Sequence, residues 1–233
     1  MIRIGYHANP NTIALCKAAE NGSHTAGFIL SGFGTCPAPG EICDNGIERA
    51  LQFAAHYLQK AIDALFSAKA SVEQAQSYLL HQLERINANI SYFNRNIGQG
   101  IYLAGVLCYF DGDRYICVPF GGGRAYLWEN GAISTIGNHK PDDPYIRDAL
   151  GGMMTHQNMF FIAVGSLPIG AHIICATVDI PHDQIAPVMA NLSAVEPQFV
   201  VSELSGNSTD YDIPLALIDF AMHPDQRKEE DAE

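Results

Sequence analysis

The sequence predicts an α+β fold with mainly antiparallel sheets. Short β-rich runs are separated by Asp-Gly-Asp at 111–113, Gly-Gly-Gly at 121–123 and Glu-Asn-Gly at 129–131, which are typical hairpin turns. Apolar residues recur at spacings of three and four over residues 47–65 and again over 72–93, which predicts two long amphipathic helices. Hairpins and helices mixed in this way are typical of the α+β class.

The N-terminal third predicts three strands followed by the two helices. The β-rich runs cover residues 1–7, 12–18 and 25–34, and a turn-rich stretch follows them. The first helix begins near Asp44, and Ser71 with Gln74 forms a capping box that starts the second, which continues to about Asn94. Each helix has one apolar stripe, so we expect the pair to lie against a sheet.

The remainder of the chain predicts more sheet and two shorter helices. The further β-rich runs are 101–110, 114–120, 125–136, 159–165, 172–178 and 213–220. Residues 183–192 have a helical pattern despite Pro187, and Pro197 is suited to the first position of a short helix that ends before Gly206.

The bulk composition predicts one domain. The chain has 233 residues, of which 48% are apolar, and it has neither internal repeats nor a low-complexity linker. We therefore expect a single domain over residues 1–222. Residues 223–233 form an acidic tail that we expect to be disordered, because it has little apolar material to anchor it.

Charge and cysteine usage exclude several classes of partner. Thirteen Lys and Arg against 25 Asp and Glu give a net charge of −12, which argues against nucleic acid and anionic membranes as partners. No signal peptide and no apolar run of membrane-spanning length is visible. The six cysteines include no Cys-x-x-Cys pair, so we expect reduced, buried cysteines in a cytoplasmic protein.

Five segments resemble, in order, the motifs of a known family. They are FILSGFGTCPAPGEICDNGIERAL (28–51), VPFGGGRAYLWENGAISTIGNHKPDD (118–143), YIRDALGG (145–152), LPIGAHIICATVDIPHDQIAPVM (167–189) and GNSTDYDIPLALIDF (206–220). Together they resemble the metal-dependent protein phosphatases, the type 2C serine/threonine (PPM) family. The resemblance implies a four-layer αββα sandwich, in which two mainly antiparallel sheets are flanked by helix pairs.

The catalytic positions of that family are degenerate in this chain. Family members bind two or more Mn²⁺ or Mg²⁺ ions through aspartates at strand ends, because hard dications need clustered carboxylate oxygens. The resemblance places the family's "DG" motif on Ser31 and Gly32, and its phosphate-binding arginine on Tyr6. The other aspartate positions fall on Asn11, Gly122, Thr177 and Tyr211.

The resemblance therefore implies the fold and argues against the activity. We expect a catalytically inactive, phosphatase-like binding or regulatory module with no metal cofactor. Its partner would be a protein, with a basic surface suited to the acidic chain, and a homo-oligomer is compatible with this interpretation. Gly121, Gly122 and Gly123 are interpreted as a plain turn, because a phosphate cradle of the GxxxxGK[ST] type is not present.

A second hypothesis stays open. The chain could be a divergent serine/threonine phosphatase or another phosphohydrolase that binds Mn²⁺ or Mg²⁺ through relocated ligands. The candidate ligands are Glu41, Asp179, Asp210, Asp212 and His139, the last in a loop that also contains Asp142 and Asp143.

Overall fold

The structure is a computed structural model that describes residues 1–9, 11–19, 22–35, 41–97, 100–137, 149–152, 160–192, 196–206 and 215–223. The strands are β1 (Ile2–Ala8), β2 (Thr12–Ala18), β3 (His24–Thr35), β4 (Gly100–Asp111), β5 (Arg114–Phe120), β6 (Arg124–Glu129), β7 (Ala132–Ile136), β8 (Ala163–Ser166), β9 (His172–Ala176) and β10 (Ala216–Met222). The helices are α1 (Glu41–Ala68), α2 (Val72–Ile97), α3 (His182–Leu192) and α4 (Pro197–Gly206).

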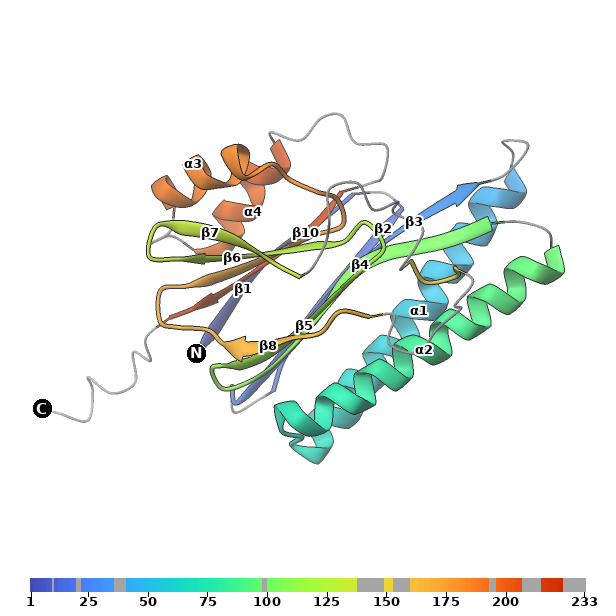
Figure 1. The fold of residues 1–233 in the computed structure, drawn as a ribbon, viewed down its shortest axis with the longest axis horizontal. Coiled ribbons are helices and arrows are strands. Elements are labelled where there is room, and N and C mark those ends of the chain that lie inside the picture. The colour runs from blue at the N-terminus through green and yellow to red at the C-terminus, as the bar shows by residue number, and fades with distance from the viewer. Residues whose placement is uncertain are drawn as a thin grey trace, which may run out of the picture.

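The strands form two five-stranded sheets. Sheet A has the order β1-β10-β9-β6-β7, and sheet B has the order β2-β3-β4-β5-β8. Every pairing within the two sheets is antiparallel. Figure 1 shows the sheets face to face, with α1 and α2 outside sheet B and α3 and α4 outside sheet A. The predicted α+β class and the αββα sandwich are confirmed.

Three apolar layers hold these elements together. The first lies between sheet B and the α1–α2 pair, the second between the two sheets, and the third between sheet A and the α3–α4 pair. Alternate residues of a central strand point to opposite faces, so a single strand contributes to two layers. In β3, for example, Phe28 and Leu30 face the helices, whereas Ile29 faces sheet A.

The two long helices follow the predicted pattern. Leu58 and Ile62 of α1, and Leu79 and Leu83 of α2, lie fully buried against sheet B. The capping box at the start of α2 is formed as expected: Gln74 Oε1 accepts a hydrogen bond from the backbone nitrogen of Ser71 at 3.0 Å, and Ser71 Oγ accepts one from the nitrogen of Gln74 at 3.4 Å. The first helix begins at Glu41, slightly before the predicted start.

The turn predicted within the run at 125–136 is confirmed. The run is a hairpin of two strands, β6 and β7, turned at Asn130 and Gly131, which both have positive φ. Other predicted boundaries need correction. The run at 159–165 becomes strand only at Ala163, because its ladder with β5 begins there, while Phe160 packs edge-on against Phe120. The short helix α4 starts at Pro197 as predicted and includes Gly206.

None of the helices in the described part of the chain has an apolar stretch long enough to cross a membrane.

Candidate functional site

One end of the sandwich collects strand termini from both sheets. In sheet A the pair Ala8–Ala216 joins the end of β1 to the start of β10, and β9 ends where β6 begins. In sheet B the pair Thr12–Ser31 joins the start of β2 to β3. The short connections 9–11 and 121–123 cross here from one sheet to the other. We call this region the strand-end site, and it contains four of the predicted positions: Asn11, Ser31, Gly122 and Thr177.

Ser31 lies at the centre of this site, in the layer between the sheets. It has the same strand parity as Ile29, so its side chain faces sheet A, and it is completely buried. Its Oγ atom has no hydrogen-bond partner among the residues that the structure describes. The neighbouring Gly32 faces α1 instead, where an added Cβ would stand 2.4 Å from Cγ2 of Ile47. A short hydroxyl thus occupies the place at which the resemblance expects a carboxylate.

The glycine triplet is a turn that packs on β4. Gly121 has φ +58°, and the nitrogen of Gly123 donates a hydrogen bond to the oxygen of Phe120 at 3.0 Å. A Cβ at Gly123 would lie 2.0 Å from the backbone oxygen of Gly105. The strand β6 follows at once, so the triplet does not open a helix as a phosphate-binding loop would.

Thr177 follows β9 and is hydrogen-bonded to the start of β10. Its Oγ1 atom accepts a hydrogen bond from the nitrogen of Ala216 at 2.8 Å, and its own nitrogen donates to the oxygen of Ala216 at 3.1 Å. The side chain is completely buried.

Asp179, an alternative metal ligand, is already engaged by two side chains. Tyr126 Oη donates a hydrogen bond to its Oδ1 at 2.7 Å, and Arg124 Nε lies 3.8 Å from the same oxygen. Tyr126 Oη in turn accepts a hydrogen bond from the nitrogen of Ile180 at 2.7 Å. Burial, followed by the hydrogen bond to Asp179, raises the pKa of Tyr126 and keeps this phenol a donor. The carboxylate of Asp179 therefore holds the segment 177–180 against β6.

Of the two earliest predicted positions, Asn11 belongs to the strand-end site, whereas Tyr6 lies two residues before the end of β1. Tyr6 is on β1 with 54% of its surface exposed, and its nitrogen donates to Oε1 of Gln198 at 3.2 Å. Asn11 has φ +67° in the connection between β1 and β2 and is exposed. Neither residue supplies a cation or an anion to the site.

The remaining candidates cannot be placed at the site. Tyr211, Asp210, Asp212, His139, Asp142 and Asp143 lie outside the described residues, and the side chain of Glu41 does as well.

The described residues do not fit a two-metal centre. Mn²⁺ and Mg²⁺ bind chiefly carboxylate oxygens, and two adjacent dications need several of them. At the strand-end site the positions of interest provide the hydroxyls of Ser31 and Thr177, no side chain at Gly122, and the engaged carboxylate of Asp179. Within the described ranges, the one cluster of three potential ligand side chains consists of cysteines, which are soft ligands.

Two face-to-face antiparallel sheets with a helix pair on each outer side are the fold of the PP2C (PPM) serine/threonine phosphatases, and comparison with solved structures confirms that this chain has that fold. Stp1 of Staphylococcus aureus, a serine/threonine phosphatase, superposes with a TM-score of 0.66 at 13% identity, covering 96% of this chain and 95% of that one. PstP/Ppp of Mycobacterium tuberculosis gives 0.62 at 15% identity, covering 95% and 99%.

A further match contains metal. The catalytic domain of the phosphatase PstP in complex with two manganese ions gives a TM-score of 0.60 at 16% identity, covering 96% of this chain and 100% of that one. No protein-family model matches the sequence, and no curated protein matches it either. The resemblance predicted from the ordered motifs is thus confirmed at the level of the fold.

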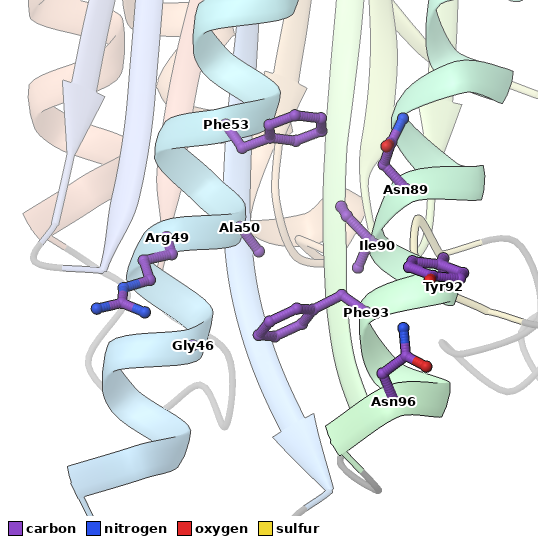
Figure 2. A pocket seen from close by; sticks show the side chains of 9 residues that line it. All are labelled: Gly46, Arg49, Ala50, Phe53, Asn89, Ile90, Tyr92, Phe93 and Asn96. Carbon is purple, nitrogen blue, oxygen red and sulfur yellow. The ribbon is translucent and has the colours of Figure 1, made fainter.

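A hollow lies on the outer side of sheet B, between α1 and α2. This groove has a volume of about 420 Å³ and is lined by Gly46, Arg49, Ala50, Phe53, Asn89, Ile90, Tyr92, Phe93 and Asn96. Figure 2 shows Phe53 of α1 and Phe93 of α2 turned toward the gap between the helices, with Arg49 on the outer side of α1. Ala50 and Ile90 are buried beneath them, so the groove has an apolar floor and a rim of arginine and asparagine.

Two features of the interior were not found from the sequence. The first is a buried pair on the α4 side of sheet A, in which Nδ1 of His172 lies 2.9 Å from Oδ2 of Asp219. The second is the cysteine cluster. Strand alternation could have placed each residue on a face, but His172 and Asp219 are 47 residues apart and Cys108 and Cys175 are 67 residues apart. The strands had to be paired, and for the cysteines the two sheets had to be stacked, before these side chains met.

Proposed function

We propose that this protein is a phosphatase-fold binding module without metal-dependent catalysis, that is, a pseudophosphatase that acts by protein–protein contact. The observation that carries the proposal is the strand-end site, where Ser31, Gly122 and Thr177 stand at positions that the resemblance assigns to metal-binding aspartates. A two-metal mechanism needs those charges both to hold the ions and to offset them.

The packing of the site supports the same conclusion. Gly123 contacts the backbone of β4, and Thr177 is hydrogen-bonded to Ala216. These positions stabilise the junction between strands, a role that does not depend on a bound ion. A buried serine hydroxyl at Ser31 adds no charge to attract one.

The groove between α1 and α2 is our candidate contact surface. Its volume of about 420 Å³ suits one or two apolar side chains of a partner segment. Phe93 and Tyr92 remain 39% and 68% exposed at its edge, as is typical of aromatic anchors at interfaces. The net charge of −12 belongs to the whole chain and favours a partner that is basic outside the docked apolar segment, since the described lining of the groove includes Arg49 and no acidic residue. A second copy of the chain is the alternative occupant.

The competing function is a divergent Mn²⁺- or Mg²⁺-dependent phosphohydrolase. It would have to draw ligands from Glu41, Asp210, Asp212 and His139, together with an Asp179 freed from Tyr126 and Arg124. Four unpaired cysteines on the described strands fit the reducing cytoplasm in either case.

Thermal melting with and without Mn²⁺ distinguishes the two functions. A true site would stabilise the protein by about 2.7 kcal/mol at a hundredfold excess of Mn²⁺ over its dissociation constant. We expect no such shift, and a saturable increase in melting temperature would favour the hydrolase.

The binding role is tested by a pull-down in which the wild type, Phe93→Asp and Tyr78→Asp each serve as the bait. Light scattering then measures the mass of the recovered complex. Phe93→Asp should lose the partner that the wild type retains equally in Mn²⁺ and in chelator, because it places a charge in the groove. Tyr78→Asp is the matched control, since Tyr78 is also on α2 and equally exposed (38% against 39% for Phe93) but does not line the groove. Equal recovery with both variants would remove the groove from the proposal.

A further inference from the structure

Three cysteines meet in the layer between the two sheets. Cys108 on β4 and Cys117 on β5 are directly paired across sheet B, and Cys175 on β9 faces them from sheet A. Their Sγ atoms all lie within 4.8 Å of one another, and those of Cys108 and Cys175 are 3.5 Å apart. All three side chains are buried, at 0–1% exposure.

The same row of sheet B contains a fourth sulfur. Cys16 on β2 pairs with Gly27 on β3, and Gly27 pairs with Cys108, so the row reads cysteine, glycine, cysteine, cysteine. A Cβ at Gly27 would stand 3.0 Å from Cys16 Sγ. The missing side chain of Gly27 therefore leaves space for the sulfur of Cys16. The row contains three thiols, those of Cys16, Cys108 and Cys117.

We propose that Cys108, Cys117 and Cys175 form a binding site for one soft monovalent metal ion, Cu(I), which joins the two sheets from within.

The geometry of the sulfurs suits three-coordinate binding. A metal–sulfur bond of about 2.3 Å places the corners of a trigonal site about 4 Å apart. The observed triangle, with one edge of 3.5 Å and none longer than 4.8 Å, needs only small side-chain adjustments to reach that size. Thiolates select soft ions such as Cu(I) over the hard Mn²⁺ and Mg²⁺. Zn²⁺ is a poorer occupant because it nearly always takes a fourth ligand. The fourth sulfur, that of Cys16, is not in the group that lies within 4.8 Å, and the other side chains of this layer include the apolar Ile29, Phe110 and Phe220.

Metal binding to these thiols should depend on pH. Each thiol that becomes a thiolate ligand releases one proton, so the binding of Cu(I) should tighten as the pH rises.

A disulfide between the sheets, from Cys108 to Cys175, is a poorer solution for these sulfurs, and one between the paired residues Cys108 and Cys117 of sheet B would leave Cys175 unpaired. The S–S bond is about 2.05 Å long and joins Cα atoms less than about 7 Å apart, whereas face-to-face sheets stand about 10 Å apart. Closing the 3.5 Å separation of Cys108 and Cys175 to a bond would pull the sheets together, and the third sulfur would remain unpaired.

The test is a competition for Cu(I) between the full-length, reduced protein and the coloured chelator bicinchoninate under anaerobic conditions. We expect about one equivalent of Cu(I) to transfer slowly to the protein, and the binding constant to fall by roughly tenfold or more in Cys117→Ala and in Cys175→Ala. The control variant Cys36→Ser/Cys43→Ala changes the two cysteines that are not among the four thiols of the described strands, and it should bind like the wild type.

Two readouts keep the result independent of misfolding. Circular dichroism and melting of the metal-free variants check that each alanine variant folds, and X-ray absorption of the loaded wild type should give copper–sulfur distances near 2.3 Å with three sulfurs. The proposal is overturned if Cu(I) stays with the chelator, if Cys117→Ala binds as well as the wild type, or if the Cys36→Ser/Cys43→Ala variant loses the ion.

Discussion

Thr177 and Ala216 exchange two hydrogen bonds at the strand-end site. Oγ1 of Thr177 accepts from the nitrogen of Ala216 at 2.8 Å, and the nitrogen of Thr177 donates to the oxygen of Ala216 at 3.1 Å. Thr177, to which the phosphatase resemblance assigns a metal-binding aspartate, thus ties the end of β9 to Ala216, the first residue of β10.

Replacing Thr177 with valine should destabilise the fold. The change keeps the shape but leaves the buried nitrogen of Ala216 without its hydroxyl acceptor, which costs about 1–2 kcal/mol of unfolding free energy. Urea unfolding measures this loss. Thr135→Val is the control, because the Thr135 hydroxyl lies 3.1 Å from His182 Nε2 at the exposed surface, and it should change stability by less than about 0.5 kcal/mol. Equal effects of the two variants would contradict the assigned role.

Gly123→Ala should lower the unfolding free energy far more than Gly206→Ala. The added Cβ would lie 2.0 Å from the backbone oxygen of Gly105, which cannot move without displacing β4. We expect a loss of about 3 kcal/mol or more. In Gly206→Ala the new Cβ meets no atom of the described residues within 4 Å, and the variant should be as stable as the wild type or more stable by up to about 1 kcal/mol. A tolerated Gly123→Ala would show that the glycine triplet is not packed as described.

Asp219 should make stability fall as the pH rises from the acid side. Burial raises the pKa of Asp219 above its ordinary value of 3.8, and the hydrogen bond with His172 offsets only part of that shift. Between 3.8 and the higher folded-state pKa the unfolded chain binds fewer protons than the folded chain, so the contribution of Asp219 to stability is lost as the pH increases through this window.

The matched variant is Asp219→Asn, whose amide oxygen can still accept a hydrogen bond from His172. We expect the difference in unfolding free energy between wild type and Asp219→Asn to decline with pH through that window and then level off. Urea unfolding over a pH series that starts below 3.8 checks this. A difference independent of pH would mean that the carboxyl has the same pKa in both states.

Much of the fold could be predicted from the sequence because its signals are local. The three-and-four spacing of apolar residues around Leu58 and Leu79 specifies a helix and its buried face. The Asn130–Gly131 turn specifies the hairpin between β6 and β7 by its backbone requirements. The resemblance of the ordered motifs to the type 2C phosphatases then predicted the αββα sandwich.

The interior of the site could not be predicted in the same way. The contacts of Asp179 with Tyr126 and Arg124 depend on the pairing of β6 with β9, strands far apart in the sequence. The meeting of Cys108 with Cys175 depends in addition on how the two sheets are stacked. A slip of one residue in any register would turn these side chains to the other face of the sheet. The local sequence does not encode that register.

Hydrolysis of p-nitrophenyl phosphate by the purified protein, measured with excess Mn²⁺ and with chelator, tests the central claim most directly. The account predicts no metal-dependent turnover above that of a Ser31→Ala variant, because the strand-end site lacks the carboxylates that hold two dications. Mn²⁺-dependent turnover that disappears in Asp179→Ala or Asp212→Ala would contradict it and identify the protein as a phosphatase with relocated ligands.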